Sequence, residues 1–200
     1  MDFNLEKYRQ PVAEDLLKQV HSVNNCEFPE LIALQGFHVA NPEFKKTAKK
    51  IRTHFSLPAE GDQVIYIFTI HCDKMDSGTL QLIVDAASTV IEADGQGYTQ
   101  ITGINNINFN HRLENVTNEV VLYVGTSGDI SQRLREHVGY GSKGTATIFL
   151  KEWPDFINSN VDLRFQYYNF GPNFPTEALK MIEHRLSYDL KPILGRNRKA

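Results

Sequence analysis

Three segments of the chain carry the hydrophobic pattern of β-strands. Residues 63–70 (QVIYIFTI) are apolar on both faces, which is typical of a central strand covered on two sides. Residues 120–125 form a β-branched and aromatic run that stops at Gly125, and residues 161–170 alternate between apolar and polar side chains. The pattern predicts a small three-stranded sheet, mixed or antiparallel.

Helical periodicity marks four further segments. Apolar residues recur at near-helical spacing in residues 1–20, where Pro11 either splits the helix or marks its start. The other helical segments are residues 42–55, 77–92 with Ser77 as N-cap, and 176–190 with Thr176 as N-cap. The asparagine-rich residues 99–109 predict a loop.

These elements predict an α/β (α+β) domain at residues 61–200, with the small sheet flanked by helices. A helical N-terminal extension at residues 1–60 precedes this domain. Residues 73–118 form an insertion, with its own helix, between the first and second strands.

A strand, a turn and a helix follow one another in residues 120–138. Asp129 is a good N-cap with Gln132 three residues later, and Gly139 is a good stop. The apolar stripe of the helix consists of Ile130, Leu134 and Val138.

Two polar residues lie on the edge of that stripe. At about 100° per residue, Arg133 and His137 look toward the strand that bears Tyr123, whereas Arg135 points away. A buried arginine requires a partner carboxylate or phosphate. The spacing therefore predicts a site between this helix and the sheet.

Composition restricts the location of the protein and its partners. The formal net charge of −3 means that any DNA contact comes from a local basic patch. The two cysteines show no metal-ligand spacing, which suits a reducing cytoplasm. Residues 1–6 lack the features of a signal peptide, and no apolar run approaches a membrane span, so we expect a soluble cytoplasmic protein.

The ordered set of polar residues resembles the second half of a GIY-YIG nuclease domain. The set comprises the Tyr-Val-Gly triplet at residues 123–125, the R-x-x-x-H pattern of Arg133 and His137, and Glu183 on the last helix, followed by a proline. The resemblance covers residues 120–200 well and residues 61–119 poorly. It implies a metal-dependent endonuclease.

The resemblance also implies a role for each residue. Arg133 would hold the scissile phosphate, and Glu183 would bind Mg²⁺ or Mn²⁺. Tyr123, a second tyrosine or His137 would orient and deprotonate the attacking water. A tyrosine needs neighbouring positive charge for this role, because its reference pKa is about 10.

Glu183 also stands out from its own position, since it falls within the apolar stripe of its helix. That stripe consists of Leu179, Ile182, Leu186 and Leu190. An inward carboxylate is costly unless it is paired or metal-bound. An internal ion pair with Arg133 or His137 is the alternative to a metal site.

The first half of the family motif departs from the pattern. Residues 64–66 (Val-Ile-Tyr) have the right character, but Gln63 replaces the glycine of the family. Tyr98 competes with Tyr66 for the role of second tyrosine, and Tyr66 lies in the better strand. If neither enters the site, His137 carries the base role or the enzyme is inactive.

Candidate DNA-binding residues lie in three places. Residues 42–55 carry a cationic helix face, the flexible loop at residues 139–145 is suited to a phosphate, and Arg135 points outward. The candidates are Lys45, Lys46, Lys49, Lys50, Arg135, Lys143 and Thr145. The alternatives are a solvated surface and a plain connection. The sequence thus predicts a divalent-metal-dependent DNA endonuclease or, alternatively, an inactive nucleic-acid-binding module of the same fold.

Overall fold

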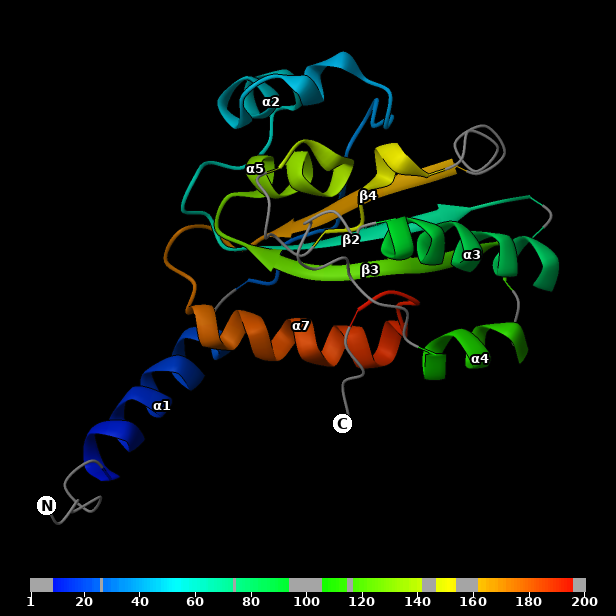
Figure 1. The fold of residues 1–200 in the computed structure, drawn as a ribbon. Coiled ribbons are helices and arrows are strands. Elements are labelled where there is room, and N and C mark those ends of the chain that lie inside the picture. Colours follow the sequence, from blue (N-terminus) through cyan, green and yellow to red (C-terminus); the bar gives the residue numbers. More distant parts are fainter. Residues whose placement is uncertain are drawn as a thin grey trace, which may run out of the picture.

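The sheet has four antiparallel strands in the order β1-β4-β2-β3, with β2 paired on both sides (Figure 1). The strands are β1 (Ile32–Ala33), β2 (Val64–His71), β3 (Glu119–Ser127) and β4 (Asp162–Asn169). The computed structural model describes residues 9–25, 27–73, 75–93, 106–114, 117–141, 147–153 and 162–195. The α+β class is confirmed, and the pairings are antiparallel rather than mixed.

Strand β1 is an addition to the predicted three-stranded sheet, and it lies within residues 1–60, where the sequence predicted a helical extension. Its two residues pair with β4 through Ile32↔Tyr167 and Ala33↔Gln166. Two residues are too few for an alternating pattern, so the strand leaves no signal in the sequence.

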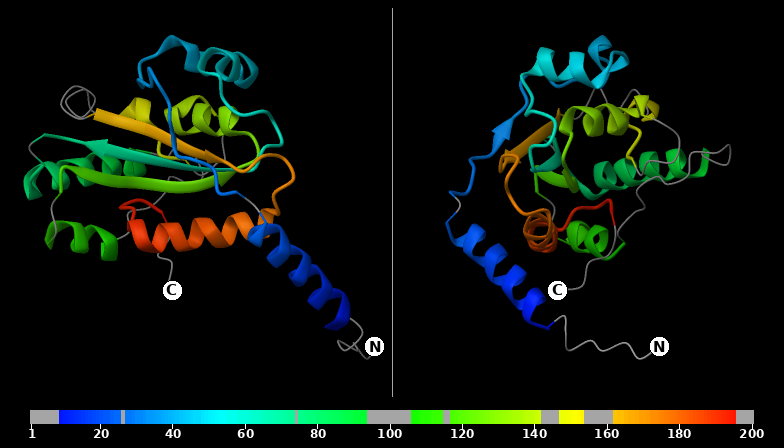
Figure 2. Two further views of the ribbon diagram at one scale, coloured as in Figure 1. Left: turned by 180° about the vertical axis from the view of Figure 1, so that it is seen from behind. Right: turned by 90° about the vertical axis from the view of Figure 1, so that its left-hand side faces the viewer.

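Helices cover both faces of the sheet. On one face lie α5 (Ile130–Arg135) and the π-helical turn η3 (Glu136–Tyr140), with α2 (Ala48–Phe55) above α5, while α7 (Thr176–Leu190) lies on the opposite face (Figures 1 and 2). The remaining helical elements are α1 (Arg9–Asn24), η2 (Pro42–Lys45), α3 (Ser77–Ala93), α4 (Asn106–Glu114) and η4 (Leu150–Glu152).

Alternate residues of β2 enter two separate cores, as expected of a strand buried on both faces. The α5-face core includes Tyr66, Phe68, Leu122, Ile130 and Leu134. The α7-face core includes Ile65, Ile67, Val121, Val124 and Leu179. Full burial of each such apolar side chain contributes about 1.5–3 kcal/mol.

A β-bulge in β3 decides which residues reach the α5 face. Phe68 pairs with Tyr123, whereas the next residue, Thr69, pairs with Val121. Leu122 is the extra residue, so Tyr123 lies on the α5 face and Val121 on the α7 face. Without the bulge, these two residues would share a face.

The predicted helix at residues 42–55 is broken in two. The Asn41 side chain accepts the Glu43 N–H at 3.0 Å and caps η2, and Lys46 then adopts an extended conformation. Thr47 precedes the first residue of α2. The apolar periodicity runs through this break, because Phe44 and Ile51 are both fully buried.

Three further local predictions about residues 77–92, 99–109 and 176–190 need correction. The carboxylate of Asp76 accepts the Thr79 N–H at 2.7 Å, so the cap of α3 is Asp76 rather than Ser77. Pro175 is the N-cap of α7, and Thr176 is its first residue. Part of the predicted loop is helix α4, whose polar residues gave no amphipathic pattern.

The predicted N-cap of the helix after β3 is confirmed, and the predicted helix is divided into α5 and the π-helical turn η3. The Asp129 side chain accepts the Gln132 N–H at 3.1 Å, which caps α5. Gly139 has a φ of +110°, a conformation that favours glycine, and it interrupts the helical geometry.

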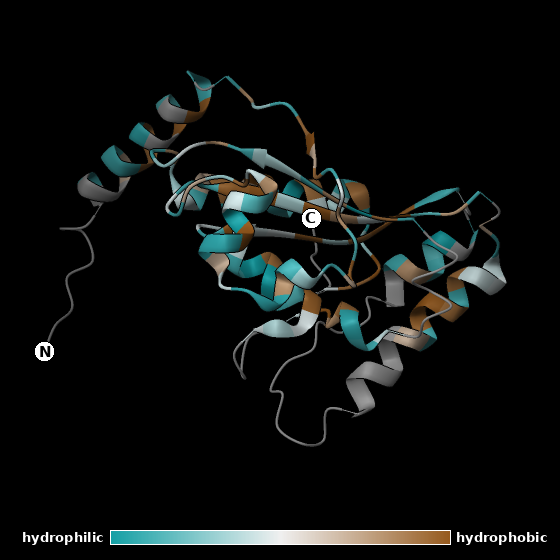
Figure 3. Ribbon diagram, turned by 90° about the horizontal axis from the view of Figure 1, so that it is seen from above, coloured by the Kyte–Doolittle hydropathy of each residue, from teal (hydrophilic) through white to brown (hydrophobic). Residues whose placement is uncertain are grey.

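Helix α1 extends outward from the α7 side of the protein (Figure 2), and its Val23 packs against the α7-face core. Hydrophobic and hydrophilic residues alternate along it (Figure 3), and Leu16, Leu17 and Val20 are exposed. Among the described residues, no helix combines the length and apolar character that crossing a membrane requires.

Candidate active site

The hydroxyl group of Tyr66 joins two elements of the α5 face. It lies 2.8 Å from Nε2 of His137 in η3, and Nε of Arg133 in α5 donates to it at 3.1 Å. Tyr66 projects from the central strand and is 1% exposed, and His137 is fully buried. The structure therefore brings together Tyr66, Arg133 and His137, and the predicted direction of both helix residues is correct.

The hydrogen bonds of His137 identify its tautomer. The backbone N–H of Ile148 donates to Nδ1 at 3.4 Å, so Nδ1 is the acceptor nitrogen and Nε2 carries the hydrogen. Nε2 then donates to the Tyr66 oxygen, as Arg133 does. The Tyr66 oxygen then accepts two hydrogen bonds.

Burial controls the charges of this cluster. Burial raises the pKa of Tyr66 well above 10, and Tyr123 raises it further, while Arg133 opposes both effects. Burial, followed by the positive charge of Arg133, holds the pKa of His137 well below 6.5. Both rings are therefore neutral at physiological pH.

Arg133 keeps its positive charge in this site. Burial acts to lower its pKa, but the interactions with Tyr66 and Glu136 outweigh burial and raise the pKa above its usual value. The cluster is thus one cation held against two neutral polar rings.

Tyr123 and Gly125 complete the cluster from β3. The Tyr123 ring is half-buried, and its centroid lies 6.0 Å from that of Tyr66 and 5.1 Å from that of His137. A Cβ added at Gly125 would lie 2.5 Å from the Tyr66 hydroxyl oxygen. The glycine of the Tyr-Val-Gly triplet thus provides the space for the hydroxyl.

Glu136 belongs to the site, although it was not predicted from the sequence. Nη1 of Arg133 lies 3.0 Å from its carboxylate, and the Gln132 amide donates to the same carboxylate at 2.9 Å. Glu136 is therefore the carboxylate partner that the partly buried arginine requires. In the sequence, Glu136 stands three residues after Arg133 and four residues after Gln132. Side chains at these spacings are neighbours on a helix, so the sequence did contain a signal for this contact.

Glu183 lies on the other side of the sheet. It is 4% exposed, so its predicted inward direction is correct, and the Ser187 hydroxyl donates to it at 3.4 Å. Its helix packs against the α7-face core. Arg133 and His137 contact Tyr66 on the α5 face instead.

The chain after α7 connects the two faces at the outer edge of β3. The N–H groups of Ile193 and Leu194 donate to the carbonyls of Val121 and Leu122. A Cβ at Gly195 would be 3.9 Å from the Tyr123 ring. The segment that follows the Glu183 helix therefore returns to the edge of the candidate site.

Metal-ligating residues are sparse in the described part of the chain, which contains no group of three or more His, Cys, Asp or Glu side chains arranged to hold an ion. Mg²⁺ often takes one or two carboxylates and fills its shell with water and phosphate oxygens. Glu183 supplies one such carboxylate, and 4% of the residue is exposed.

The predicted DNA-binding residues have different environments. Lys45, Lys46, Lys49 and Lys50 are exposed, and Lys46 pairs with Glu43. Nε of Arg135 donates to the Lys46 carbonyl at 2.9 Å, which ties α5 to α2. Lys143, Thr145 and the competing Tyr98 lie outside the described residues.

Arg52 belongs to residues 42–55, which were predicted to carry a cationic face, and it departs from that prediction. Its side chain is 22% exposed and bonds the Asp129 carboxylate at 3.0 Å. It therefore supports the cap of α5 instead of facing solvent. This bond holds α2 over the helix that carries Arg133.

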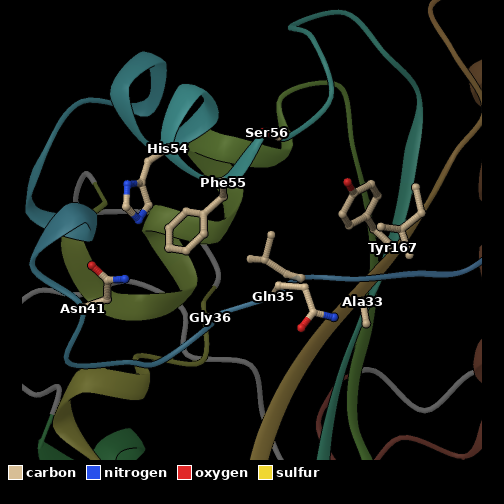
Figure 4. A pocket seen from close by; sticks show the side chains of 10 residues that line it. Ala33, Gln35, Gly36, Asn41, His54, Phe55, Ser56 and Tyr167 are labelled. Carbon is tan, nitrogen blue, oxygen red and sulfur yellow. The ribbon is translucent and has the colours of Figure 1, made fainter.

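A separate hollow of about 620 Å³ opens between β1 and the end of α2 (Figure 4). His54, Asn41 and Gln35 supply polar groups to its wall, and Tyr167 lies across from them. None of the predicted catalytic residues lines it.

Comparisons of the chain with protein-family models, with curated proteins and with solved structures gave no match.

Proposed function

We propose that this protein is a divalent-metal-dependent endonuclease that hydrolyses phosphodiester bonds in DNA by chemistry of the GIY-YIG type. The observation that carries this proposal is the buried Tyr66 hydroxyl, which accepts hydrogen bonds from both Arg133 and His137. An arginine held against a buried tyrosine combines a phosphate-binding group with a group that can orient water.

Arg133 would hold the scissile phosphate and stabilise the charge that develops on it. Arg133 stays protonated, because its pKa is raised above the usual value. In addition, 18% of its side-chain surface is exposed, so part of the side chain can contact a substrate. A guanidinium fork matches the geometry of phosphate oxygens.

Tyr66 would orient the attacking water through its hydroxyl group. If the hydroxyl loses its proton during attack, the two donors from Arg133 and His137 stabilise the phenolate. His137 is fully buried and its Nδ1 faces the Ile148 N–H, which favours a supporting role for His137 over that of direct base.

Glu183 would hold Mg²⁺ or Mn²⁺. The metal would supply Lewis-acid stabilisation of the leaving oxygen. The exposed lysines of η2 and α2 would contact the DNA backbone on the same side of the sheet as Arg133.

The second candidate function is a nucleic-acid-binding module without catalysis. The near-complete burial of Tyr66 and His137 favours it, because a reacting water must reach the hydroxyl group.

Plasmid nicking separates the two functions. Purified protein with Mg²⁺ or Mn²⁺ should convert supercoiled plasmid to the open-circular form, and excess chelator should stop the reaction. Tight DNA binding without nicking under either metal would contradict the endonuclease and support the binding module.

A further inference from the structure

Arg133 is held from two sides in the free protein. Nε donates to Tyr66, and Nη1 donates to the Glu136 carboxylate at 3.0 Å. A carboxylate and a phosphate present similar oxygens to a guanidinium group, and both bind it side-on. Glu136 therefore occupies a part of Arg133 that a phosphate would use.

Glu136 is built into the structure rather than loosely paired. Only 11% of its side-chain surface is exposed. The Gln132 amide holds its second carboxylate oxygen at 2.9 Å, and the Thr147 hydroxyl donates to its backbone carbonyl at 2.7 Å.

Gly141 fixes the position of the Glu136 side chain. A Cβ added at Gly141 would lie 2.5 Å from Cγ of Glu136, so the chain passes directly against that side chain. An ion pair held this way keeps one geometry, unlike a surface pair, in which two long side chains must be ordered.

We propose that Glu136 is an internal substitute for the substrate phosphate: it positions Arg133 in the free protein and gives way to a phosphodiester group when nucleic acid binds. This inference rests on the proposed function and makes Glu136 a positioning residue. Its charge opposes the incoming phosphate, while its contact keeps the guanidinium aligned with Tyr66.

Two opposite effects follow from removing the charge. Glu136→Gln removes an anion beside the phosphate site, so DNA should bind about tenfold more tightly. The single-turnover cleavage rate should fall by about tenfold, because Arg133 loses its alignment.

The experiment measures both quantities on three variants. Binding to a labelled duplex is measured with chelator, and single-turnover cleavage is measured with Mg²⁺. Glu136→Asp retains the charge and should bind DNA like wild type. Glu152→Gln is the matched control, because its carboxylate is 59% exposed and pairs only at 3.5 Å with Lys151; neither quantity should change.

Tighter DNA binding together with slower cleavage in Glu136→Gln supports the inference, because a purely structural role of Glu136 does not produce this combination. Weaker binding, or equal affinity in wild type and Glu136→Gln, would overturn it and leave an ordinary stabilising ion pair.

A probe that does not depend on cleavage separates this inference from the proposed function. The NMR signal of the Arg133 Nε–H group is followed during titration with inorganic phosphate. If Glu136→Gln responds at lower phosphate concentration than wild type, the inference stands even for a protein that cuts no DNA. If both respond alike, the inference fails even for an active nuclease.

Discussion

The two faces of the sheet share strand β2 but bury polar groups in different ways. On the α5 face, one hydroxyl joins β2, α5 and η3 through Tyr66, Arg133 and His137. On the α7 face, Glu183 and the Ser187 that donates to it lie one turn apart on one helix. Polar networks that span several elements are demanding, since an unsatisfied member costs stability.

The residues proposed to contact the phosphate and the residue proposed to hold the metal therefore lie on opposite faces of the sheet. The α5 face carries the contacts of Arg133 with Tyr66 and Glu136, whereas the helix of Glu183 packs against the opposite core. The chain that follows α7 returns to the edge of β3 beside Tyr123. The proposed nuclease therefore requires that both faces act at that edge.

The largest expected effect comes from Glu183→Gln, which tests whether the α7 face takes part. The loss of a metal ligand should reduce Mg²⁺-dependent cleavage by at least about a hundredfold, with DNA binding retained. Glu177→Gln, which alters an exposed carboxylate on the same helix, is the control. Full cleavage by Glu183→Gln would confine the chemistry to the α5 face.

Gly125→Ala should damage the α5 face itself. The added Cβ would lie 2.5 Å from the Tyr66 hydroxyl oxygen, so the ring must shift. We expect destabilisation of about 1–3 kcal/mol in chemical denaturation and a cleavage rate lower by about a hundredfold. Gly128→Ala, where no atom lies within 4 Å of the new Cβ, should resemble wild type. Equal stability of the two variants would contradict the close approach.

Acid should destabilise the protein through the α5 face. The pKa of His137 is lowered in the folded state, so below about pH 6.5 the unfolded chain binds a proton there that the folded protein does not. This group therefore makes the free energy of unfolding fall with falling pH, by up to about 1.4 kcal/mol per pH unit.

Denaturation of His137→Gln at several pH values isolates that contribution. The variant should lose part of the acid dependence, whereas His54→Gln, at an exposed position, should keep it. An identical acid dependence in wild type and His137→Gln would show that His137 is not buried as a neutral ring.

The smallest effect is expected from the exposed lysines above the α5 face. Neutralising Lys45, Lys46, Lys49 and Lys50 should weaken DNA binding regardless of sequence and lower the salt slope by about one unit per lost contact. Lys46 should matter least, because it already pairs with Glu43. Neutralising Lys180 and Arg185 on α7 is the control, and equal effects would show that DNA does not prefer the α5 face.

Local spacing predicted the direction of the α5 residues well. Three strands and the helix after Asp129 follow from residue patterns, and helical geometry then fixes where Arg133 and His137 point. Glu183 was recognised as buried for the same reason. These properties depend on a few neighbouring residues.

Long-range properties could not be predicted in this way. Glu136 competes with Glu183 as the partner of Arg133, and only the packing of α5 against β2 decides between them. The bulge at Leu122, which puts Tyr123 beside Tyr66, depends on pairing with β2. Strand β1 depends on β4, and a side chain at Asn41 breaks the helix predicted at residues 42–55.

Arg133 provides the most direct test of the central claim, because its guanidinium group donates directly to the Tyr66 hydroxyl. Single-turnover cleavage of DNA by Arg133→Ala should be at least about a hundredfold slower than by wild type, with an unchanged circular-dichroism spectrum. Arg185→Ala, at a position that is 72% exposed on the α7 side, should cleave at the wild-type rate. Equal rates for Arg133→Ala and Arg185→Ala would contradict the proposed site.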